Sequence, residues 1–191
     1  MNKLKNSAII LFIISSLFGC SQSIDNYATQ SPALDLSKFF NGSLVAHGIV
    51  QDYKGQVTRR FKVDLVAKWQ GDQGVIDEVF YFDDGEVDYR CWRLTKSANR
   101  YIGTANDVVG KAQGVVSGNT LNWKYDLNVK TDNGEMTLFL DDWLYLIDDN
   151  TLINKTDMSL FGLDVAEVTL SINKQPHLTD GKLSANCQFP T

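Results

Sequence analysis

Residues 121–129 read LNWKYDLNV, and this short run decides the fold class of the chain. Its odd-numbered positions are apolar and its even-numbered positions are polar. Alternation at a period of two is typical of a β-strand that buries one face and leaves the other in water. Residues 61–69 and 166–172 alternate in a similar way. The sequence therefore predicts an all-β fold built from antiparallel strands.

Short runs of Gly, Asn and Asp separate the alternating segments. These residues adopt positive φ or bind their own backbone, which hairpin turns require. The run Asp83-Asp84-Gly85 is one example. The segments between such turns predict about eight to ten strands. They lie roughly at residues 44–52, 57–69, 75–82, 86–95, 100–106, 112–117, 120–130, 135–147, 150–158 and 164–173.

A meander of this length has two edge strands unless it closes on itself. Edge strands expose unpaired backbone groups, and closure into a barrel removes them. We therefore expect an antiparallel meander closed as a β-barrel, with a two-sheet sandwich as the alternative. The expected architecture is similar to that of the calycins, the group that includes the lipocalins. This similarity implies a fold and no particular chemistry.

The first 19 residues have the layout of a bacterial lipoprotein signal peptide. Lys3 and Lys5 form a basic start, residues 8–17 are mostly apolar, and residues 17–20 read LFGC. The apolar run is shorter than the ~20 residues that cross a bilayer, and its layout is typical of a removable signal. The LFGC run resembles a lipobox, which is cut before a cysteine that receives lipid. We therefore expect a lipid anchor on Cys20.

The residue after Cys20 indicates a location. Ser21 stands where an inner-membrane retention signal typically places Asp. By resemblance to Gram-negative lipoproteins, we expect the periplasmic face of the outer membrane. The chain then divides into a signal peptide (1–19), a lipidated N-terminus with a flexible tether (20–38) and a β-barrel domain (39–191). The membrane is the expected partner through the lipid, and no protein partner can be named.

The charge of the chain excludes one class of partner. The formal net charge is −5, and removal of Lys3 and Lys5 with the signal makes it two units more negative. Nucleic-acid binding requires a basic surface that contacts phosphates. We therefore expect no nucleic-acid partner.

Two cysteines remain once Cys20 is assigned to the anchor. Cys91 and Cys187 would lie in an oxidising compartment, where an even pair favours a disulfide. Such a bond would tie the C-terminal tail to a strand in the middle of the domain. Two buried free thiols are the alternative.

The acidic hairpin predicts a charged pair inside the barrel. If residues 83–85 form the turn, Glu78 faces Arg90 across the two strands. Both would share a strand face with Trp92 and other aromatic side chains. An ion pair in this setting either stabilises the packing or forms part of a headgroup-binding site. A buried pair is weak evidence for stability alone, so a ligand role is worth testing.

The run Asp141-Asp142-Trp143 places two acids in an otherwise apolar strand. Successive side chains point to opposite faces, so one aspartate is expected to point inward and to need a partner. An ion-pair lock is favoured over a catalytic acid. The candidate partners are Arg59, Arg60, Arg90, Arg93, Asn154 and Lys155.

No motif for catalysis or metal binding stands out. The two histidines, His47 and His177, have no nucleophile near them in the sequence and are expected to be structural or exposed. The acidic residues 83–88 fit a hairpin turn better than a calcium loop, which needs about six or seven wrapped oxygen ligands. We therefore predict no catalytic residue, no metal and no cofactor.

Several motifs spread over residues 39–174 point to a known family. They are Phe39-Phe40-Asn41-Gly42, Thr58-Arg59-Arg60-Phe61, Glu78-Val79-Phe80, Asp84-Gly85-Glu86, Arg90-Cys91-Trp92, Tyr101-Ile102-Gly103-Thr104-Ala105, Asp107-Val108-Val109-Gly110, Gly118-Asn119 and Asp141-Asp142-Trp143. On these residues the chain resembles DUF3833, a Gram-negative lipoprotein family of unknown function. The family more often has another residue at position 91, so the resemblance does not decide the disulfide. It implies a periplasm-facing lipoprotein and no reaction.

Three functions are compatible with these observations, and we rank them. The first is a lipoprotein that binds a fatty acyl chain or another apolar ligand in the barrel. The second is a structural or interaction module of an envelope complex, which a filled barrel would favour. The third is an enzyme acting on a lipid-like substrate through an acidic residue. The expected ligand-binding residues are Glu78, Arg90, Trp92, Asp141, Asp142 and Trp143.

Overall fold

The computed structural model describes residues 22–131, 134–175 and 181–190. The predicted signal peptide, Cys20, Ser21 and His177 lie outside the described residues. Within these ranges no helix is long and apolar enough to cross a membrane.

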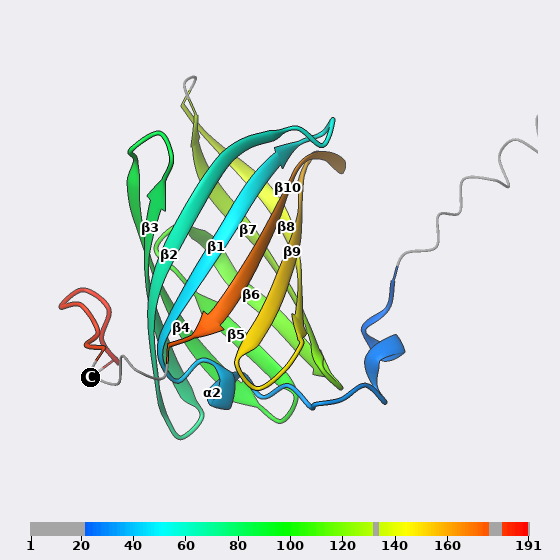
Figure 1. Cartoon of the computed structure of the whole chain (residues 1–191), viewed down its shortest axis with the longest axis vertical. Coiled ribbons are helices and arrows are strands. Elements are labelled where there is room, and N and C mark those ends of the chain that lie inside the picture. Colours follow the sequence, from blue (N-terminus) through cyan, green and yellow to red (C-terminus); the bar gives the residue numbers. More distant parts are fainter. Residues whose placement is uncertain (1–21, 132–133, 176–180, 191) are drawn as a thin grey trace, which may run out of the picture.

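Ten antiparallel strands form a closed barrel, in which each strand pairs with its neighbours in the chain and β1 closes onto β10 (Figure 1). This confirms the all-β closed meander, and the sandwich alternative is wrong. The strands are β1 (Gly42–Asp52), β2 (Val57–Gln70), β3 (Gln73–Phe82), β4 (Val87–Ser97), β5 (Arg100–Thr104), β6 (Val108–Ser117), β7 (Thr120–Thr131), β8 (Gly134–Leu146), β9 (Thr151–Leu160) and β10 (Leu163–Lys174).

The strand register follows the alternation in the sequence. Ala46 in β1 lies opposite Val63 of β2 on one side and Ile172 of β10 on the other, and all three are buried. In the hairpin of β3 and β4, Glu78 lies opposite Arg90, as the position of the turn predicted. Each strand therefore turns its apolar side chains towards the barrel axis.

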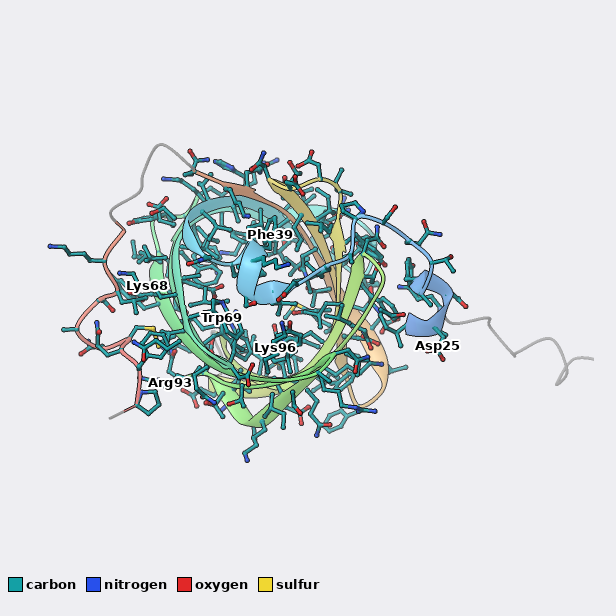
Figure 2. All side chains as sticks on the ribbon, turned by 90° about the horizontal axis from the view of Figure 1, so that it is seen from below. Asp25, Phe39, Lys68, Trp69, Arg93 and Lys96 are labelled. Atoms are coloured by element: carbon teal, nitrogen blue, oxygen red, sulfur yellow. A yellow bond between two sulfur atoms is a disulfide. The ribbon has the colours of Figure 1, made fainter. Side chains whose placement is uncertain are left out.

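A short helical segment plugs one end of the barrel. Figure 2 looks along the barrel from this end and shows α2 (Leu36–Phe39) inside the ring of strands. Asp35 caps the helix and forms an ion pair with Lys96, at 2.9 Å between Oδ1 and Nζ. The Trp69 indole N–H donates a hydrogen bond of 2.9 Å to the Phe40 carbonyl oxygen. We call Leu34–Phe40 the plug, and its end of the barrel the closed end.

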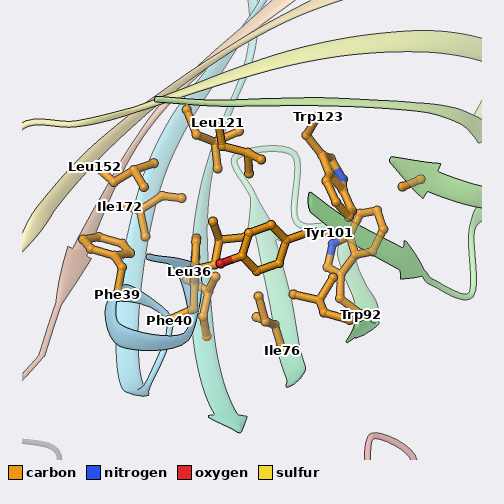
Figure 3. Close-up of a cluster of buried hydrophobic side chains, with 14 of the residues drawn as sticks. Leu36, Phe39, Phe40, Ile76, Trp92, Tyr101, Leu121, Trp123, Leu152 and Ile172 are labelled. Carbon is orange, nitrogen blue, oxygen red and sulfur yellow. The ribbon is translucent and has the colours of Figure 1, made fainter. Parts of the chain in front are cut away.

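Buried side chains fill the space directly above the plug (Figure 3). Leu36 and Phe40 belong to one buried cluster with Ile76, Tyr101, Trp92 and Trp123. The rings of Trp92 and Trp123 make an edge-to-face contact with centroids 5.6 Å apart. Gly103 leaves room for one of these indoles, because an added Cβ would lie 2.7 Å from the Trp123 ring. This packing makes the closed end a solid core.

The segment before the plug is packed against the outside of the barrel. The η2 turn (Ile24–Tyr27) places the Tyr27 ring 6.0 Å from Trp143 and 5.7 Å from Tyr145, both centroid to centroid. The Leu34 N–H donates a hydrogen bond of 2.9 Å to the Gly118 carbonyl oxygen. Residues 22–38, expected to belong to a flexible tether, are thus held on the barrel by tertiary contacts that the polar sequence did not reveal.

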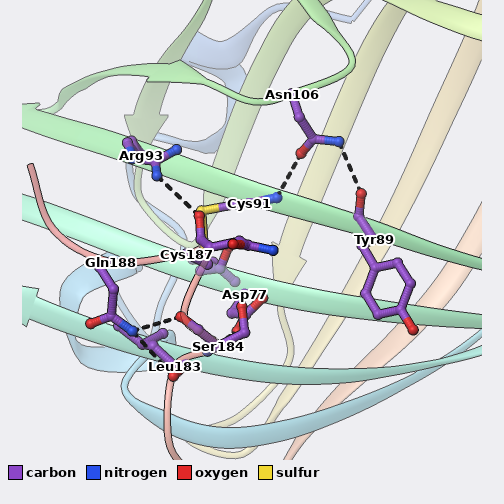
Figure 4. Close-up of a disulfide and its surroundings, with 11 residues drawn as sticks. Asp77, Tyr89, Cys91, Arg93, Asn106, Leu183, Ser184, Cys187 and Gln188 are labelled. Atoms are coloured by element: carbon purple, nitrogen blue, oxygen red, sulfur yellow. Dashed lines mark hydrogen bonds between the residues drawn. A yellow bond between two sulfur atoms is a disulfide. The ribbon is translucent and has the colours of Figure 1, made fainter.

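The C-terminal segment crosses the outer face of β3 and β4. Cys187 forms a disulfide with Cys91, whose side chain points away from the barrel axis (Figure 4). The Ser184 N–H donates a hydrogen bond of 2.6 Å to Oδ2 of Asp77, and Arg93 donates one of 3.3 Å to the Asn186 carbonyl oxygen. The disulfide joins two positions that are 96 residues apart in the sequence.

Candidate functional site

The barrel is hollow above its core. A cavity of about 710 Å³ lies between the closed end and the opposite end of the barrel. Its lining extends to Glu86 and Asp88, which are exposed residues at the β3–β4 hairpin, so the cavity opens towards solvent there. We call this end, where the β1–β2, β3–β4 and β9–β10 hairpins turn, the mouth.

Most of the cavity wall is apolar. Three phenylalanines line one side, with Phe61 5.5 Å from Phe82 and Phe80 stacked 6.2 Å from Phe82, between ring centroids. Aliphatic and thioether side chains from the other strands complete the wall, among them Val50, Val63, Leu127, Leu140, Met158, Val168 and Leu170. The alternation in each strand turns these residues inward.

Polar side chains interrupt this wall at mid-height of the barrel. They occupy inward positions on β3, β4, β7, β8 and β9 and one position in the β5–β6 turn. On β3, β7, β8 and β9 apolar residues lie above and below them, whereas on β4 Arg90 lies between Trp92 and Asp88. We call them the polar belt: Glu78, Arg90, Asp107, Tyr125, Asp142, Asn154 and Thr156.

Arg90 is bound by Asp107. The guanidinium Nε donates to both carboxylate oxygens at 2.8 and 3.0 Å, and Nη2 lies 2.7 Å from Oδ2. The expected ion pair between Arg90 and Glu78 is wrong: both residues are described, they lie opposite each other, and no ion pair joins them within 4.0 Å. The β5–β6 turn brings Asp107 from outside the hairpin and places it in line with the guanidinium fork.

Glu78 faces the cavity without a protein partner. Among the described residues, its carboxyl group makes no hydrogen bond and no ion pair. Burial raises the pKa of Glu78 to about 7, against the attraction of Arg90, and the charges of Asp107 and Asp142 raise it further. The group is therefore divided between its neutral and charged forms near neutral pH.

Asp142 is the inward member of the aspartate pair. It is 8% exposed, and its Oδ2 accepts a hydrogen bond of 3.1 Å from the Tyr125 hydroxyl. Its Oδ1 is buried and has no partner among the described residues. Burial raises the pKa of Asp142 to about 7, although hydrogen bonds favour the charged form. Burial also raises the pKa of Tyr125, which keeps its hydroxyl protonated as a donor.

Asp141 points outward and does not belong to the site. Its Oδ2 lies 2.8 Å from Nζ of Lys124, and its Oδ1 accepts a hydrogen bond from Asn122. Tyr125, the observed partner of Asp142, was not among the six predicted candidates, of which only Arg90 and Asn154 belong to the polar belt.

The two predicted tryptophans have different places. Trp92 lines the cavity and packs edge-to-face on Tyr125, with ring centroids 5.3 Å apart. Trp143 lies on the outer face under Tyr27 and does not line the cavity, so its expected ligand role is wrong. Odd-numbered positions of β8 face outward, and Asp141 points outward like Trp143. The alternation places Trp143 on the face opposite to Asp142, so these two residues could not both line the cavity.

Sequence reasoning missed three members of the belt. Thr156 stands on β9 at the same parity as the candidate Asn154, so its inward direction could have been inferred. Tyr125 stands in LNWKYDLNV at the same parity as Trp123, so its inward direction could have been inferred. Asp107 lies in a turn, where no periodic pattern predicts the direction of a side chain.

Another arginine lies at the mouth. The guanidinium carbon of Arg59 lies 3.6 Å from the centre of the Phe82 ring, and Nη2 lies 2.7 Å from both Asp84 and Glu86. Its Nε is buried without a partner among the described residues. Arg59 therefore joins the hairpin turn to the upper cavity wall.

The described residues contain no group of three or more His, Cys, Asp and Glu side chains that could hold a metal ion. His47 is exposed on β1. The belt can accept hydrogen bonds from a ligand through Glu78 and Asp142. The apolar wall of the cavity can surround the rest of that ligand.

These features define a calycin-like β-barrel with a plugged base and an open internal cavity. The protein is similar in fold to the S-type phycobiliprotein lyase CPES from Guillardia theta, with a TM-score of 0.52 and 8% identity over 85% of this chain and 99% of that one. The chain belongs to the family described as protein of unknown function (DUF3833), whose model matches residues 14–174.

Weaker structural similarities were also found. EF1p2_mFAP2b bound to DFHBI has a TM-score of 0.44 and 8% identity over 74% of this chain and all of that one. The ywiB protein from Bacillus subtilis has a TM-score of 0.36 and 12% identity over 70% and 90% of the two chains. The comparison with curated proteins finds no match.

Proposed function

We propose that this protein is a lipoprotein anchored at the periplasmic face of the outer membrane, and that it binds a lipid or another apolar ligand in its barrel. The observation that carries the proposal is the open cavity of about 710 Å³ with a mostly apolar wall. Ligand sites usually measure about 300–1,000 Å³ and combine apolar walls with a few placed polar groups. The polar belt supplies such groups.

Apolar side chains at the mouth support a role at lipid surfaces. Phe161 is 97% exposed and Leu163 72% exposed in the β9–β10 hairpin, and Tyr53 is 72% exposed in the β1–β2 hairpin. The two hairpins are neighbours, because Asp52 pairs with Ala166. Exposed apolar groups at a rim favour contact with a membrane. Ligand exchange would then occur where the cavity opens.

The structural-module alternative fits the barrel less well. A filled interior would favour that hypothesis, whereas the barrel contains an open cavity. A catalytic role is the second candidate, because a carboxyl group with a pKa of about 7 in a cavity suits general acid–base chemistry. Incubation of the protein with an envelope lipid extract, followed by mass spectrometry, tests it: new products that disappear in the Glu78→Gln and Asp142→Asn variants would favour an enzyme.

Binding is tested with the neutral apolar dye N-phenyl-1-naphthylamine, which fluoresces strongly in apolar surroundings. The delipidated wild-type protein is expected to bind the dye at a single saturable site. Val50→Trp fills the cavity from β1 and is expected to weaken binding by roughly tenfold or more, because a filled site excludes the dye.

Ile49→Trp is the matched control, since Ile49 is the adjacent residue of β1 and does not line the cavity. This variant is expected to bind like the wild type. Absence of saturable dye binding to the wild type, or equal binding by both tryptophan variants, would contradict the proposed function.

A further inference from the structure

The charges of the polar belt are unbalanced. Arg90 is its single cation, whereas Glu78, Asp107 and Asp142 are carboxyl groups. The fork of Arg90 is engaged by Asp107 through Nε and Nη2. At the level of the belt, two carboxyl groups therefore face the cavity without a cation of their own. The other cations of the lining, Arg59 and Lys130, lie towards the mouth, where Arg59 pairs with Asp84 and Glu86.

These two groups are also short of hydrogen-bond donors. Oδ1 of Asp142 is buried and without a partner among the described residues, and the Glu78 side chain has none there either. The Tyr125 hydroxyl already donates to Asp142, and the Thr156 hydroxyl donates to Asn154 at 2.9 Å. Buried acceptors are normally satisfied, so the missing donor is expected from a ligand.

The rings around the belt suit a cation as well. Trp92 and Tyr125 make an edge-to-face pair at the level of Arg90, whose guanidinium lies 6.0 Å from the Trp92 ring. Aromatic faces attract ammonium groups. A carboxylate ligand would instead add a third unpaired negative charge beside Glu78 and Asp142, in a site where water screens charges poorly.

We propose that the cavity selects amphiphiles whose polar end is an amine, held as an ammonium group by Glu78 and Asp142, with the apolar body along the wall formed by Phe61, Phe80 and Phe82. This inference rests on the proposed binding function and names the class of its ligand. It replaces the fatty acid, which the sequence alone favoured, with a cationic lipid.

The preference is expected to depend on pH. Inside the barrel, Glu78 is neighboured by Arg90, Asp107 and Asp142, and Asp77 adds a negative charge from the outer face. Asp142 is neighboured by Tyr125, Arg90 and Glu78, and Asp141 adds a negative charge from the outer face. Both carboxyl groups have a pKa raised to about 7, so they are mostly charged at about pH 8 and mostly neutral at about pH 5.5. The amine preference is therefore expected to be strong at the higher pH and weak at the lower one.

The test displaces N-phenyl-1-naphthylamine from the full barrel with dodecylamine, dodecanol and dodecanoate, which share one chain and differ in the headgroup. At about pH 8 the amine is expected to displace the dye at a concentration roughly tenfold or more below that of the acid, the effect of one hydrogen bond to a charged group. The alcohol is expected to fall between them.

Glu78→Gln and Asp142→Asn are each expected to reduce the ratio of amine to acid affinity by roughly tenfold. Asp141→Asn is the matched control, because Asp141 lies next in the strand and points outward to Lys124. If Asp142→Asn fails to fold, Glu78→Gln carries the test, since Glu78 makes no hydrogen bond that folding would lose.

The outcomes separate the two proposals. Dye binding in which dodecanoate competes as well as dodecylamine overturns the amine inference and leaves the binding function standing. An amine preference that neither Glu78→Gln nor Asp142→Asn changes also overturns the inference. Failure of the dye to bind overturns the binding function and this inference with it.

Discussion

The carboxyl group of Asp142 is held in a costly environment. It is 8% exposed, its Oδ2 accepts a hydrogen bond from the Tyr125 hydroxyl, and its Oδ1 is unpaired among the described residues. Charged groups that lose water without full compensation destabilise the folded state. A site optimised for stability alone would place an apolar residue here, and this cost is expected where a ligand completes the site.

The cost predicts how stability changes with pH. The pKa of Asp142 is raised in the folded protein to about 7, above the value of about 3.9 in an unfolded chain. The folded state therefore binds the proton more tightly, and the contribution of this group to stability is complete below about pH 4 and is lost as the pH rises to about 7. The pKa of Glu78 is also raised, so the contribution of this group to stability is likewise lost as the pH rises.

Asp142→Asn removes one titrating group, so its free energy of unfolding should fall less steeply between about pH 4 and pH 8 than that of the wild type. Over this range, we expect the free energy of unfolding of the variant to rise by roughly 1–3 kcal/mol relative to that of the wild type. Urea denaturation at several pH values measures this, with Asp141→Asn as the control. Parallel curves for Asp142→Asn and the wild type would contradict the raised pKa.

At the scale of elements, the plug is held by the barrel and not by its own helix. The four residues of α2 are too few to form a stable helix alone. Its position depends on the Asp35 cap and ion pair with Lys96, the hydrogen bond from Trp69 to the Phe40 carbonyl oxygen, and the burial of Phe39 and Phe40. The N-terminal segment and the barrel wall are therefore expected to unfold together.

Phe40→Ala is expected to lower the free energy of unfolding by about 3–5 kcal/mol, because a buried phenylalanine is removed and its site cannot collapse inside a closed barrel. Urea denaturation followed by tryptophan fluorescence measures the change. Tyr53→Ala is the control, since Tyr53 is exposed in a hairpin and its loss should cost little. A cost below about 1 kcal/mol for Phe40→Ala would show that the plug is not part of the core.

At the scale of the whole molecule, the path of the N-terminus bears on the proposed anchor. The chain from residue 22 is packed on the outer wall of β7 and β8, where Tyr27 covers Trp143 and Tyr145. Gln22 also contacts the wall, where its Oε1 accepts a hydrogen bond of 3.2 Å from the Tyr145 hydroxyl, so a lipid on Cys20 would lie only two positions in the sequence from a contact with the barrel. The anchor would then hold the barrel close to the membrane and not at the end of a long tether.

The proposed lipidation is tested by expressing the wild type and Cys20→Ala in a Gram-negative bacterium. The wild-type protein is expected to incorporate labelled palmitate and to enter the detergent phase in Triton X-114 partitioning, because buried acyl chains give stable membrane anchoring. Cys20→Ala should incorporate no label and remain in the aqueous phase. Labelling that is equal in both proteins would contradict an anchor at this residue.

Much of the architecture follows from local sequence patterns. The alternation in residues 121–129 assigns each side chain to one face of β7, and the turn at residues 83–85 sets the register that places Glu78 opposite Arg90. The same logic required one of Asp141 and Asp142 to point inward. These features depend on neighbours in one strand or one hairpin, where geometry has few alternatives.

The tertiary structure alone decided which partners meet inside the barrel. Asp107 reaches Arg90 from a turn, Tyr125 reaches Asp142 from the neighbouring strand, and the plug returns to close one end. Whether the interior is hollow depends on the diameter of the closed barrel and on the combined volume of inward side chains from all ten strands. The strands and their faces follow from the sequence, because a period of two is a local property. The cavity and its unpaired carboxyl groups are properties of the closed assembly, because long-range packing sets them.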